Sequence, residues 1–205
     1  MIYVSHLDIN RMMTRAVRRA ELPMWYTEGF NPHPYIAFAL PLSLGQSSRC
    51  EFMDIKIETD MTNEEIKNRL SDVMPTGIEI LDVKDPDHNI NEITAAQYEV
   101  KLEFKTDEDA KHYYEKASEL LAGSELTAEK MGKKGHRKVL KQVNLAEQIY
   151  EKNITLDGNF VCFDLTVAAG NTVNLNPALL TETLSKNIGT DFDFQYIMRK
   201  GILFK

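Results

Sequence analysis

Residues 5–34 read SHLDINRMMTRAVRRAELPMWYTEGFNPHP, and the rest of the chain is organised around this stretch. Ser5 and Asp8 have the spacing of a capping box, so we expect a helix to begin here. Pro23 ends that helix, and the prolines within 31–34 impose an extended loop that contains a turn. Apolar residues recur at helical spacing and predict one face turned toward a core: Ile9, Met12, Met13, Ala16, Val17 and Ala20.

The size and composition of the chain describe a globular protein. Its 205 residues suit one large domain or two small ones. A composition of 43% hydrophobic and 27% charged residues is that of a folded protein rather than a disordered one. No apolar run approaches the roughly 20 residues of a membrane span, and the chain does not begin with a secretory signal. We therefore expect a cytoplasmic location.

The order of predicted elements indicates the fold class. In the first part, strands are predicted at 2–4, 35–42, 51–58 and 78–83, with a turn at 45–48 and helices beginning at Ser5 and Thr62. A polar linker at 84–92 follows. In the second part, the predicted elements are a strand at 98–104, a helix from Thr106, a hairpin after 126, a second hairpin at 153–167, a helix from Asn176 and a strand at 196–204.

This order predicts an α+β fold built from two tandem ferredoxin-like (βαββαβ) units with antiparallel sheets. The N-terminal unit would span residues 1–88 and the C-terminal unit residues 93–205. No residue-by-residue identity relates the two halves, so the prediction depends on element order. The alternative is a single α+β domain with one continuous sheet.

Positive charge is concentrated in two places, although the net charge of the chain is −7. In the first helix, Arg11, Arg15 and Arg18 have the spacing i, i+4, i+7, and Arg19 lies close by. Guanidinium groups converging on one helix face suit the phosphate backbone of a nucleic acid. The alternative interpretation is a solvated helix face on which Asp8 pairs with its arginine neighbours.

The second basic segment is the tip of the hairpin after residue 126. Glycines are interleaved with its basic residues, which allows the segment to adapt to RNA or to an acidic protein. It has little aromatic content, so base stacking is not predicted there. The alternative is a solubilising loop. The proposed nucleic-acid contacts in this segment are Lys133, Lys134, Arg137 and Lys138, with His136 between them.

The candidate catalytic residues are His6, Asp8, Glu28 and His33. They would form an acid/base or metal cluster if the loop folds back over the start of the first helix. No HxxxH, HxH or CxxC spacing supports metal binding, so we expect no metal and no cofactor. P-loop, GxGxxG, GxSxG and HExxH motifs do not occur in the sequence, and the usual signatures of nucleotide-binding and hydrolase families are therefore missing.

The stretch 5–34, together with PLSLGQSSRCEFMDI at 41–55, resembles the radical SAM-linked protein family. This is a bacterial domain of uncharacterised function found beside or fused to a radical SAM enzyme. The blocks VNLAEQI, NPALLTETL and YIMRKGIL are similar to later parts of that family. The residues that match its signature are Ser5, His6, Leu7, Asp8 and Arg11, then Glu28, Gly29, Phe30, Asn31, Pro32, His33 and Pro34.

The resemblance implies a radical SAM enzyme as partner and supplies no catalytic residues. The chain cannot itself hold a radical SAM cluster, because such a cluster needs three closely spaced cysteines and the chain has only Cys50 and Cys162. Family members usually have further residues before the signature, so we expect a shortened first strand here.

We therefore expect a non-catalytic accessory module that recognises RNA, either tRNA or rRNA, for that enzyme. One alternative is an endoribonuclease using His6 and His33, which is an analogy from fold alone. The other is a purely protein-docking domain.

Overall fold

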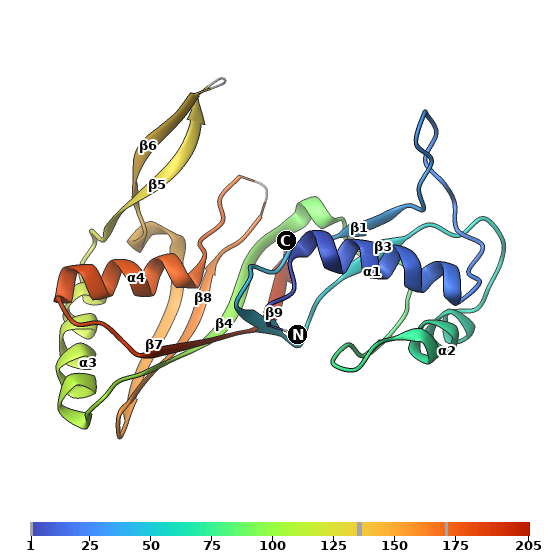
Figure 1. Ribbon diagram of the computed structural model, residues 1–205. Coiled ribbons are helices and arrows are strands. Elements are labelled where there is room, and N and C mark those ends of the chain that lie inside the picture. The colour runs from blue at the N-terminus through green and yellow to red at the C-terminus, as the bar shows by residue number, and fades with distance from the viewer. Residues whose placement is uncertain (1, 135–136, 171) are drawn as a thin grey trace. The chain divides into compact units, whose positions relative to one another are not determined.

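The structure is a computed structural model that describes residues 2–134, 137–170 and 172–205, with side chains described outside 130–140. The chain divides into two compact units. The N-terminal unit contains residues 1–47 and 51–92, and the C-terminal unit contains residues 48–50 and 93–205. Both units combine helices with antiparallel strand pairs, so the predicted α+β class is confirmed (Figure 1). None of the helices in the described residues is long and apolar enough to cross a membrane.

The N-terminal unit is built on two helices and a short antiparallel ladder. Ile36 pairs with Ile55 in this ladder. Two residues further along the chain, Ile57 forms an isolated antiparallel bridge with Met24. The elements of this unit are α1 (His6–Arg19), β1 (Ile36–Phe38), β3 (Met53–Ile55), α2 (Asn63–Val73) and the 3-10 helix η1 (Ile90–Glu92).

The core of the N-terminal unit lies between the apolar faces of α1 and α2. Val17 and Ala20 of α1 meet Ile66 and Leu70 of α2. Loop residues complete this cluster, which includes Leu22 and Met24 and is flanked by Ile36, Ile55 and Ile57. The predicted apolar stripe of the first helix is confirmed, because Met13, Ala16, Val17 and Ala20 are buried. Burial of this stripe turns the opposite face of α1 away from the core.

Three predictions for the N-terminal unit are wrong. Residues 2–4 and 78–83 are not strands, and 45–48 contains β2 (Gln46–Ser48) instead of only a turn. Ile80 and Val83 pack against the core cluster. The alternating apolar residues at 78–83 therefore pack against the core without forming hydrogen bonds to a neighbouring strand of the described structure. Periodicity alone cannot distinguish such a packed extended segment from a strand.

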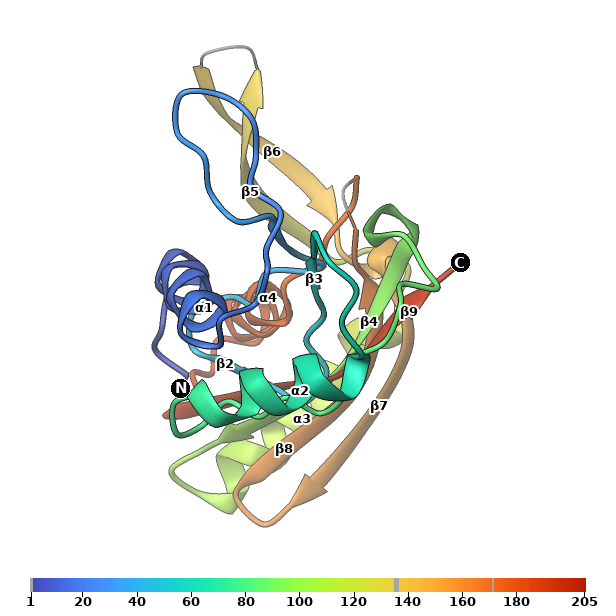
Figure 2. The same cartoon turned by 90° about the vertical axis from the view of Figure 1, so that its right-hand side faces the viewer.

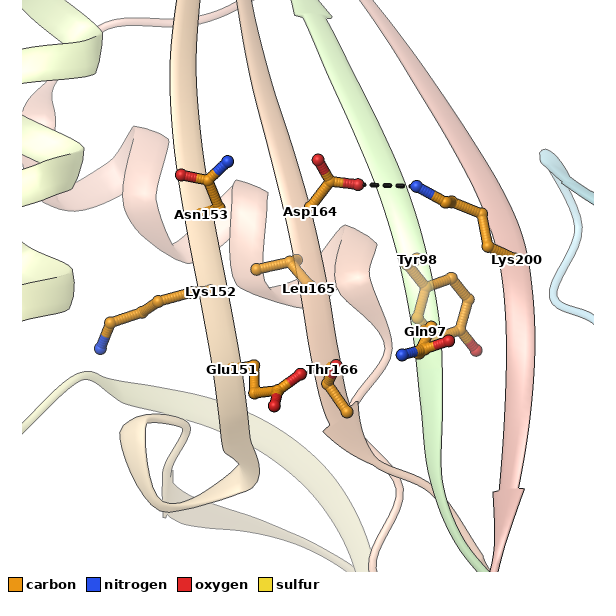
Figure 3. A pocket seen from close by; sticks show the side chains of 9 residues that line it. All are labelled: Gln97, Tyr98, Glu151, Lys152, Asn153, Asp164, Leu165, Thr166 and Lys200. Atoms are coloured by element: carbon orange, nitrogen blue, oxygen red, sulfur yellow. Dashed lines mark hydrogen bonds and ion pairs between the residues drawn. The ribbon is translucent and has the colours of Figure 1, made fainter.

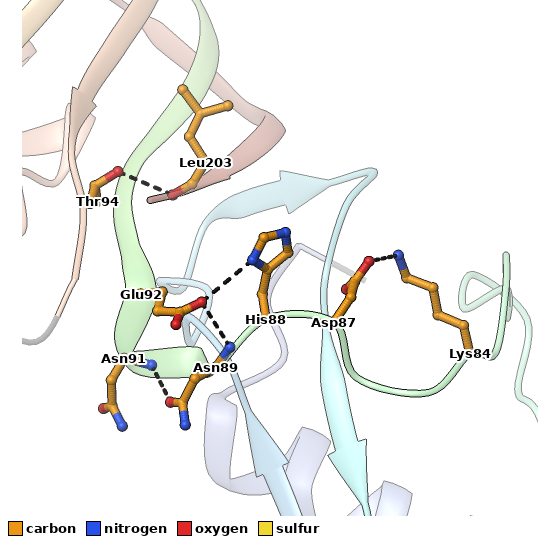
Figure 4. A network of polar contacts seen from close by, with 8 residues as sticks. All are labelled: Lys84, Asp87, His88, Asn89, Asn91, Glu92, Thr94 and Leu203. Carbon is orange, nitrogen blue, oxygen red and sulfur yellow. Dashed lines mark hydrogen bonds and ion pairs between the residues drawn. The ribbon is translucent and has the colours of Figure 1, made fainter.

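Residues 84–92 close the N-terminal unit with a local polar network (Figure 4). Lys84 Nζ lies 2.9 Å from Asp87 Oδ2. Glu92 Oε2 accepts a hydrogen bond from Asn89 N at 3.2 Å and lies 3.4 Å from His88 Nδ1. The polar side chains of this linker therefore contact residues only a few positions away in the sequence.

The C-terminal unit is a sheet in the order β9-β4-β8-β7, with residues 48–50 beside β9. Arg49 N donates to Arg199 O at 3.1 Å along that edge. The elements are β4 (Ile93–Glu103), α3 (Asp107–Ala122), β5 (Thr127–Lys134), β6 (Arg137–Asn144), the 3-10 helix η2 (Ala146–Gln148), β7 (Ile149–Asp157), β8 (Phe160–Ala168), α4 (Pro177–Ile188) and β9 (Phe194–Phe204).

Helices α3 and α4 cover one face of this sheet, and α3 packs against β7, β8 and α4 (Figure 1). Period-two alternation sends every second side chain of the strands into this layer. Tyr113, Phe104 and Phe163 are fully buried there with Leu180 and Leu184. The intervening residues of the strands project from the other face, which no helix of the described part of this unit covers.

The C-terminal unit contains all the predicted elements, including the hairpin after residue 126, which is an addition to the βαββαβ order. β4, α3, β7, β8, α4 and β9 follow one another as strand, helix, strand, strand, helix, strand. The hairpin β5–β6 stands between α3 and β7 and extends past the main sheet (Figure 2). The tandem arrangement of two such units stays a prediction.

Candidate functional site

Helix α1 begins with the predicted cap. Ser5 Oγ accepts a hydrogen bond from Asp8 N at 3.2 Å and donates one to Asp8 Oδ2 at 2.6 Å. The cap satisfies one of the free N–H groups of the first turn, and the Asp8 carboxylate interacts favourably with the positive end of the helix dipole. This local geometry fixes where the arginines of α1 fall relative to the core.

Ser5→Ala is expected to lower the free energy of unfolding of the N-terminal unit by about 1 kcal/mol, the usual cost of losing an N-cap side chain. Ser5→Thr is the matched control, because threonine keeps the hydroxyl acceptor. Denaturant unfolding followed by circular dichroism measures both variants. Equal stability of the alanine and threonine variants would contradict a capping role for Ser5.

The arginines of α1 form an exposed face opposite the buried stripe. Arg11, Arg15, Arg18 and Arg19 are all exposed, whereas Met13, Ala16 and Val17 are buried. We call Arg11, Arg15, Arg18 and Arg19 the arginine face. Because the helix brings residues at this spacing onto one side, the guanidinium groups are available to a ligand that approaches α1 from solvent.

The arginine face has few internal partners. Arg11 Nη1 lies 3.4 Å from Asp8 Oδ1, with the two side chains 72% and 57% exposed. Such an exposed pair contributes little stability. Arg19 Nη2 donates to Val73 O at 2.9 Å and helps to join α1 to α2. Within the described residues, Arg15 and Arg18 form no ion pair.

The loop that carries the signature residues Gly29–Pro34, here called the signature loop, is closed at its base by backbone hydrogen bonds. Thr27 N donates to His33 O at 2.9 Å, and Tyr35 N donates to Trp25 O at 2.9 Å. Gly29, at φ 126°, occupies a conformation that favours glycine. Phe30 at the tip is fully exposed. The loop therefore presents its Gly29–Pro34 segment outward from a fixed base.

The two candidate histidines take part in different contacts. The His6 ring packs edge-on against Phe38, with centroids 5.3 Å apart. His33 Nδ1 lies 3.0 Å from both Thr27 Oγ1 and Asn31 O.

The described contacts do not join the candidate catalytic residues into one cluster. No hydrogen bond or ion pair in the described structure links His6, Asp8, Glu28 and His33 to one another. The described residues also contain no group of three His, Cys, Asp or Glu side chains arranged for a metal ion. The geometry therefore gives no support to a shared acid/base or metal site.

The second basic segment is only partly described. In the backbone, Lys133 pairs with Lys138 and Lys134 pairs with Arg137 at the end of the β5–β6 ladder. Their side chains, and residue His136, lie outside the described part of the structure. Their contribution to nucleic-acid binding stays a prediction.

The polar side of the C-terminal sheet forms a hollow that no sequence motif predicts. An open hollow of about 340 Å³ lies there between β4, β7, β8 and β9. Figure 3 shows Asp164 and Lys200 reaching toward each other within it, with Oδ1 and Nζ 2.8 Å apart. The alternating charged residues of the 98–104 strand, Glu99, Lys101 and Glu103, indicate in the sequence that one side of this strand is polar. The other polar residues that line the hollow are Gln97, Tyr98, Glu151, Lys152, Asn153 and Thr166.

The surroundings of Cys162 do not favour a nucleophile. Burial raises the pKa of the Cys162 thiol, and nearby carboxylates including Asp157 raise it further against the opposing effect of Lys101. Cys50 Sγ lies 3.8 Å from Arg199 O. Thiolate is the reactive form of cysteine, so an environment that favours the Cys162 thiol works against nucleophilic chemistry there.

Comparison with known proteins gives a family match and structural likenesses, one of which is described here. The family described as "Uncharacterized protein conserved in bacteria (DUF2344)" matches residues 1–177. No curated protein matches the sequence. A chain in "Crystal Structure of a Cbf5-Nop10-Gar1 Complex" aligns with a TM-score of 0.49 at 9% identity, covering 98% of this chain. The alignment covers 46% of that chain, so the present chain spans less than half of its length.

Proposed function

We propose that this chain, which belongs to the uncharacterized bacterial family DUF2344, is a non-catalytic recognition module that binds RNA through the arginine face of α1. The observation that carries the proposal is the outward projection of Arg11, Arg15 and Arg18 from a helix whose other side is fixed in a core. A rigid helix loses little conformational entropy when it binds, which favours recognition by pre-arranged side chains.

Guanidinium chemistry favours phosphate as the ligand of the arginine face. Arginine presents a planar set of N–H donors that matches phosphate oxygens in a bidentate way. The rest of the chain is acidic, and the net charge is −7. Over distances beyond the Debye length, about 8 Å at physiological salt, that charge is screened, so the local field of α1 determines binding.

The partner proposal follows from the resemblance to the radical SAM-linked family. With only Cys50 and Cys162, the chain supplies recognition, and the radical chemistry belongs to a partner enzyme. The RNA would then be a tRNA or rRNA substrate that this chain presents to the enzyme. A purely protein-docking role is the competing hypothesis, and it predicts no RNA affinity.

The strand order of the C-terminal sheet supports a finer fold assignment for that unit. Counted along the chain without the β5–β6 hairpin, the strands of the β9-β4-β8-β7 sheet have the spatial order 4-1-3-2. Neighbouring strands run antiparallel, which is the arrangement expected of a ferredoxin-like unit. We infer that residues 93–205 form such a unit with an inserted hairpin. In the N-terminal unit, β1 pairs with β3 as a two-stranded ladder, so the inference does not extend there.

Replacing Arg11, Arg15 and Arg18 together with alanine is expected to weaken binding of a labelled single-stranded RNA about tenfold at low salt. The slope of log K against log salt should fall in magnitude by about 2, since each phosphate contact contributes roughly 0.7. Fluorescence anisotropy across a salt series measures both quantities.

The matched control removes three exposed positive charges elsewhere, in the variant Lys111→Ala/Lys116→Ala/Lys186→Ala. These residues lie on α3 and α4 of the C-terminal unit. The proposal fails if no RNA binds at low salt, or if the lysine variant weakens binding as much as the arginine variant. Cleavage of the RNA that disappears in His6→Ala and His33→Ala would instead favour the endoribonuclease alternative.

A further inference from the structure

The face of the C-terminal sheet that lies opposite α3 and α4 carries three aromatic rings at one end. Phe194 and Tyr196 on β9 are 63% and 52% exposed, and Phe160 on β8 is half-buried. The strand register brings them together, because Glu103 of β4 lies directly between Phe194 and Phe160. Lys101 occupies the next row, beside Tyr196. We call this surface the aromatic–acidic face.

One ring on this face already holds an ammonium group. Lys101 Nζ lies 3.6 Å from the centroid of the Phe160 ring, within the range of a cation–π interaction. Tyr196 Oη lies 3.5 Å from Glu103 Oε2, so a ring and a carboxylate are also adjacent. The combination of an aromatic face and a carboxylate is suited to a cationic side chain, which gains from both at once.

The charge of the face is negative. Among its described residues, five carboxylates project from the strands: Glu99, Glu103, Glu151, Asp157 and Asp164. The positive charges on the face are those of Lys101 and Lys200. Lys200 Nζ already forms ion pairs, at 2.8 Å from Asp164 and 3.8 Å from Glu99.

We infer that the aromatic–acidic face is a docking surface for a basic polypeptide segment of a partner protein. The stems of arginine and lysine would pack on Phe194 and Tyr196 while their charged ends meet Glu99, Glu103 and Asp164. Single-stranded nucleic acid also stacks on aromatic rings, but it requires a basic groove for its phosphates. The excess of carboxylates therefore favours a polypeptide over RNA.

This inference goes beyond the RNA-binding proposal and is independent of it. The arginine face belongs to the N-terminal unit and would bind an anion, whereas the aromatic–acidic face belongs to the C-terminal unit and would bind a cation. A recognition module with both surfaces could hold a nucleic acid with one unit and a partner protein with the other. Each surface can be disabled without changing the other.

The test uses the full chain and three labelled probes in fluorescence anisotropy. The probes are a short peptide that alternates arginine with leucine, the same peptide with glutamate in place of arginine, and a single-stranded RNA. The face variants are Phe194→Thr/Tyr196→Thr, which keeps strand propensity, and Glu99→Gln/Glu103→Gln. The charge-matched control is Glu115→Gln/Glu119→Gln on α3.

The arginine peptide is expected to bind and the glutamate peptide not to bind. Both face variants should weaken arginine-peptide binding about tenfold, while the α3 control changes it by less than about twofold. The inference is overturned if the arginine peptide does not bind, or if the α3 control weakens its binding as much as the Glu99/Glu103 variant does. It is equally overturned if Phe194→Thr/Tyr196→Thr weakens RNA binding and leaves peptide binding unchanged.

Discussion

Gly170→Ala is expected to lower the free energy of unfolding of the C-terminal unit by about 3 kcal/mol, from backbone strain together with steric overlap. Gly170 follows β8 and has φ 152°, a region that L side chains rarely adopt. A Cβ built there would lie 2.6 Å from Ile93 O. Ile93 begins β4, the strand between β8 and β9, so its backbone cannot move without disturbing the sheet.

Gly189→Ala separates the two contributions to this effect. Gly189 caps α4 at φ 77°, and nothing lies within 4 Å of a Cβ added there. Its substitution is expected to cost about 1 kcal/mol, the price of a left-handed residue alone. Urea unfolding of the two variants and of the wild type measures the difference. Equal losses in the two variants would show that the contact with Ile93 is relieved without cost.

Local signals in the sequence predicted the helix starts correctly. Ser5, Thr62, Thr106 and Asn176 each accept a hydrogen bond from the first turn of their helix. A cap depends on residues two or three positions apart, so it is visible in sequence without knowledge of the tertiary fold. The arginine face was predictable for the same reason, because helical spacing alone places its members together.

Strand pairing in the N-terminal unit was not predictable in this way. An apolar alternation at 78–83 resembles that of a strand, but these residues contribute Ile80 and Val83 to the core without joining a ladder. Conversely, β1 and β3 are only three residues long and pair across a long loop. Whether an extended segment finds a hydrogen-bonded neighbour is decided by the tertiary fold.

The aromatic–acidic face was missed because its residues are distant in sequence. Glu103 on β4 meets Phe160 on β8 and Phe194 on β9 only through the register of the finished sheet. No motif spacing connects the three residues. The candidate histidines illustrate the converse, since His6 and His33 belong to one signature and yet contact Phe38 and Thr27 separately.

The phenol of Tyr113 is expected to make the C-terminal unit sensitive to alkaline pH. Burial raises the pKa of Tyr113 from 10.0 to about 12, against a smaller opposing effect of the hydrogen bond from Ser185. Its Oη also donates to Thr181 O at 3.3 Å, which ties α3 to α4. An ionised phenolate could not donate this bond and would lose its solvation in the core.

The direction of the pH effect follows from the protonation of the Tyr113 phenol in the folded and in the unfolded chain. Below pH 10 the phenol keeps its proton in both the folded and the unfolded chain, so its contribution to stability is fully present. Between pH 10 and 12 only the unfolded chain releases the proton, and unfolding becomes easier by about 1.4 kcal/mol per pH unit, roughly 3 kcal/mol in all. Tyr113→Phe removes this dependence because phenylalanine has no proton to lose.

The free energies of unfolding of the wild type and of Tyr113→Phe, measured from pH 9 to pH 12, are therefore expected to converge and then cross. At pH 9 Tyr113→Phe should be less stable than the wild type by about 1 kcal/mol, the value of a lost hydrogen bond. As the pH rises, the wild type loses stability faster, and the variant becomes the more stable protein near pH 12. Tyr150→Phe, at a ring that is 57% exposed, should instead follow the wild-type curve. Parallel curves for Tyr113→Phe and the wild type would mean that the phenol reaches solvent in the folded state.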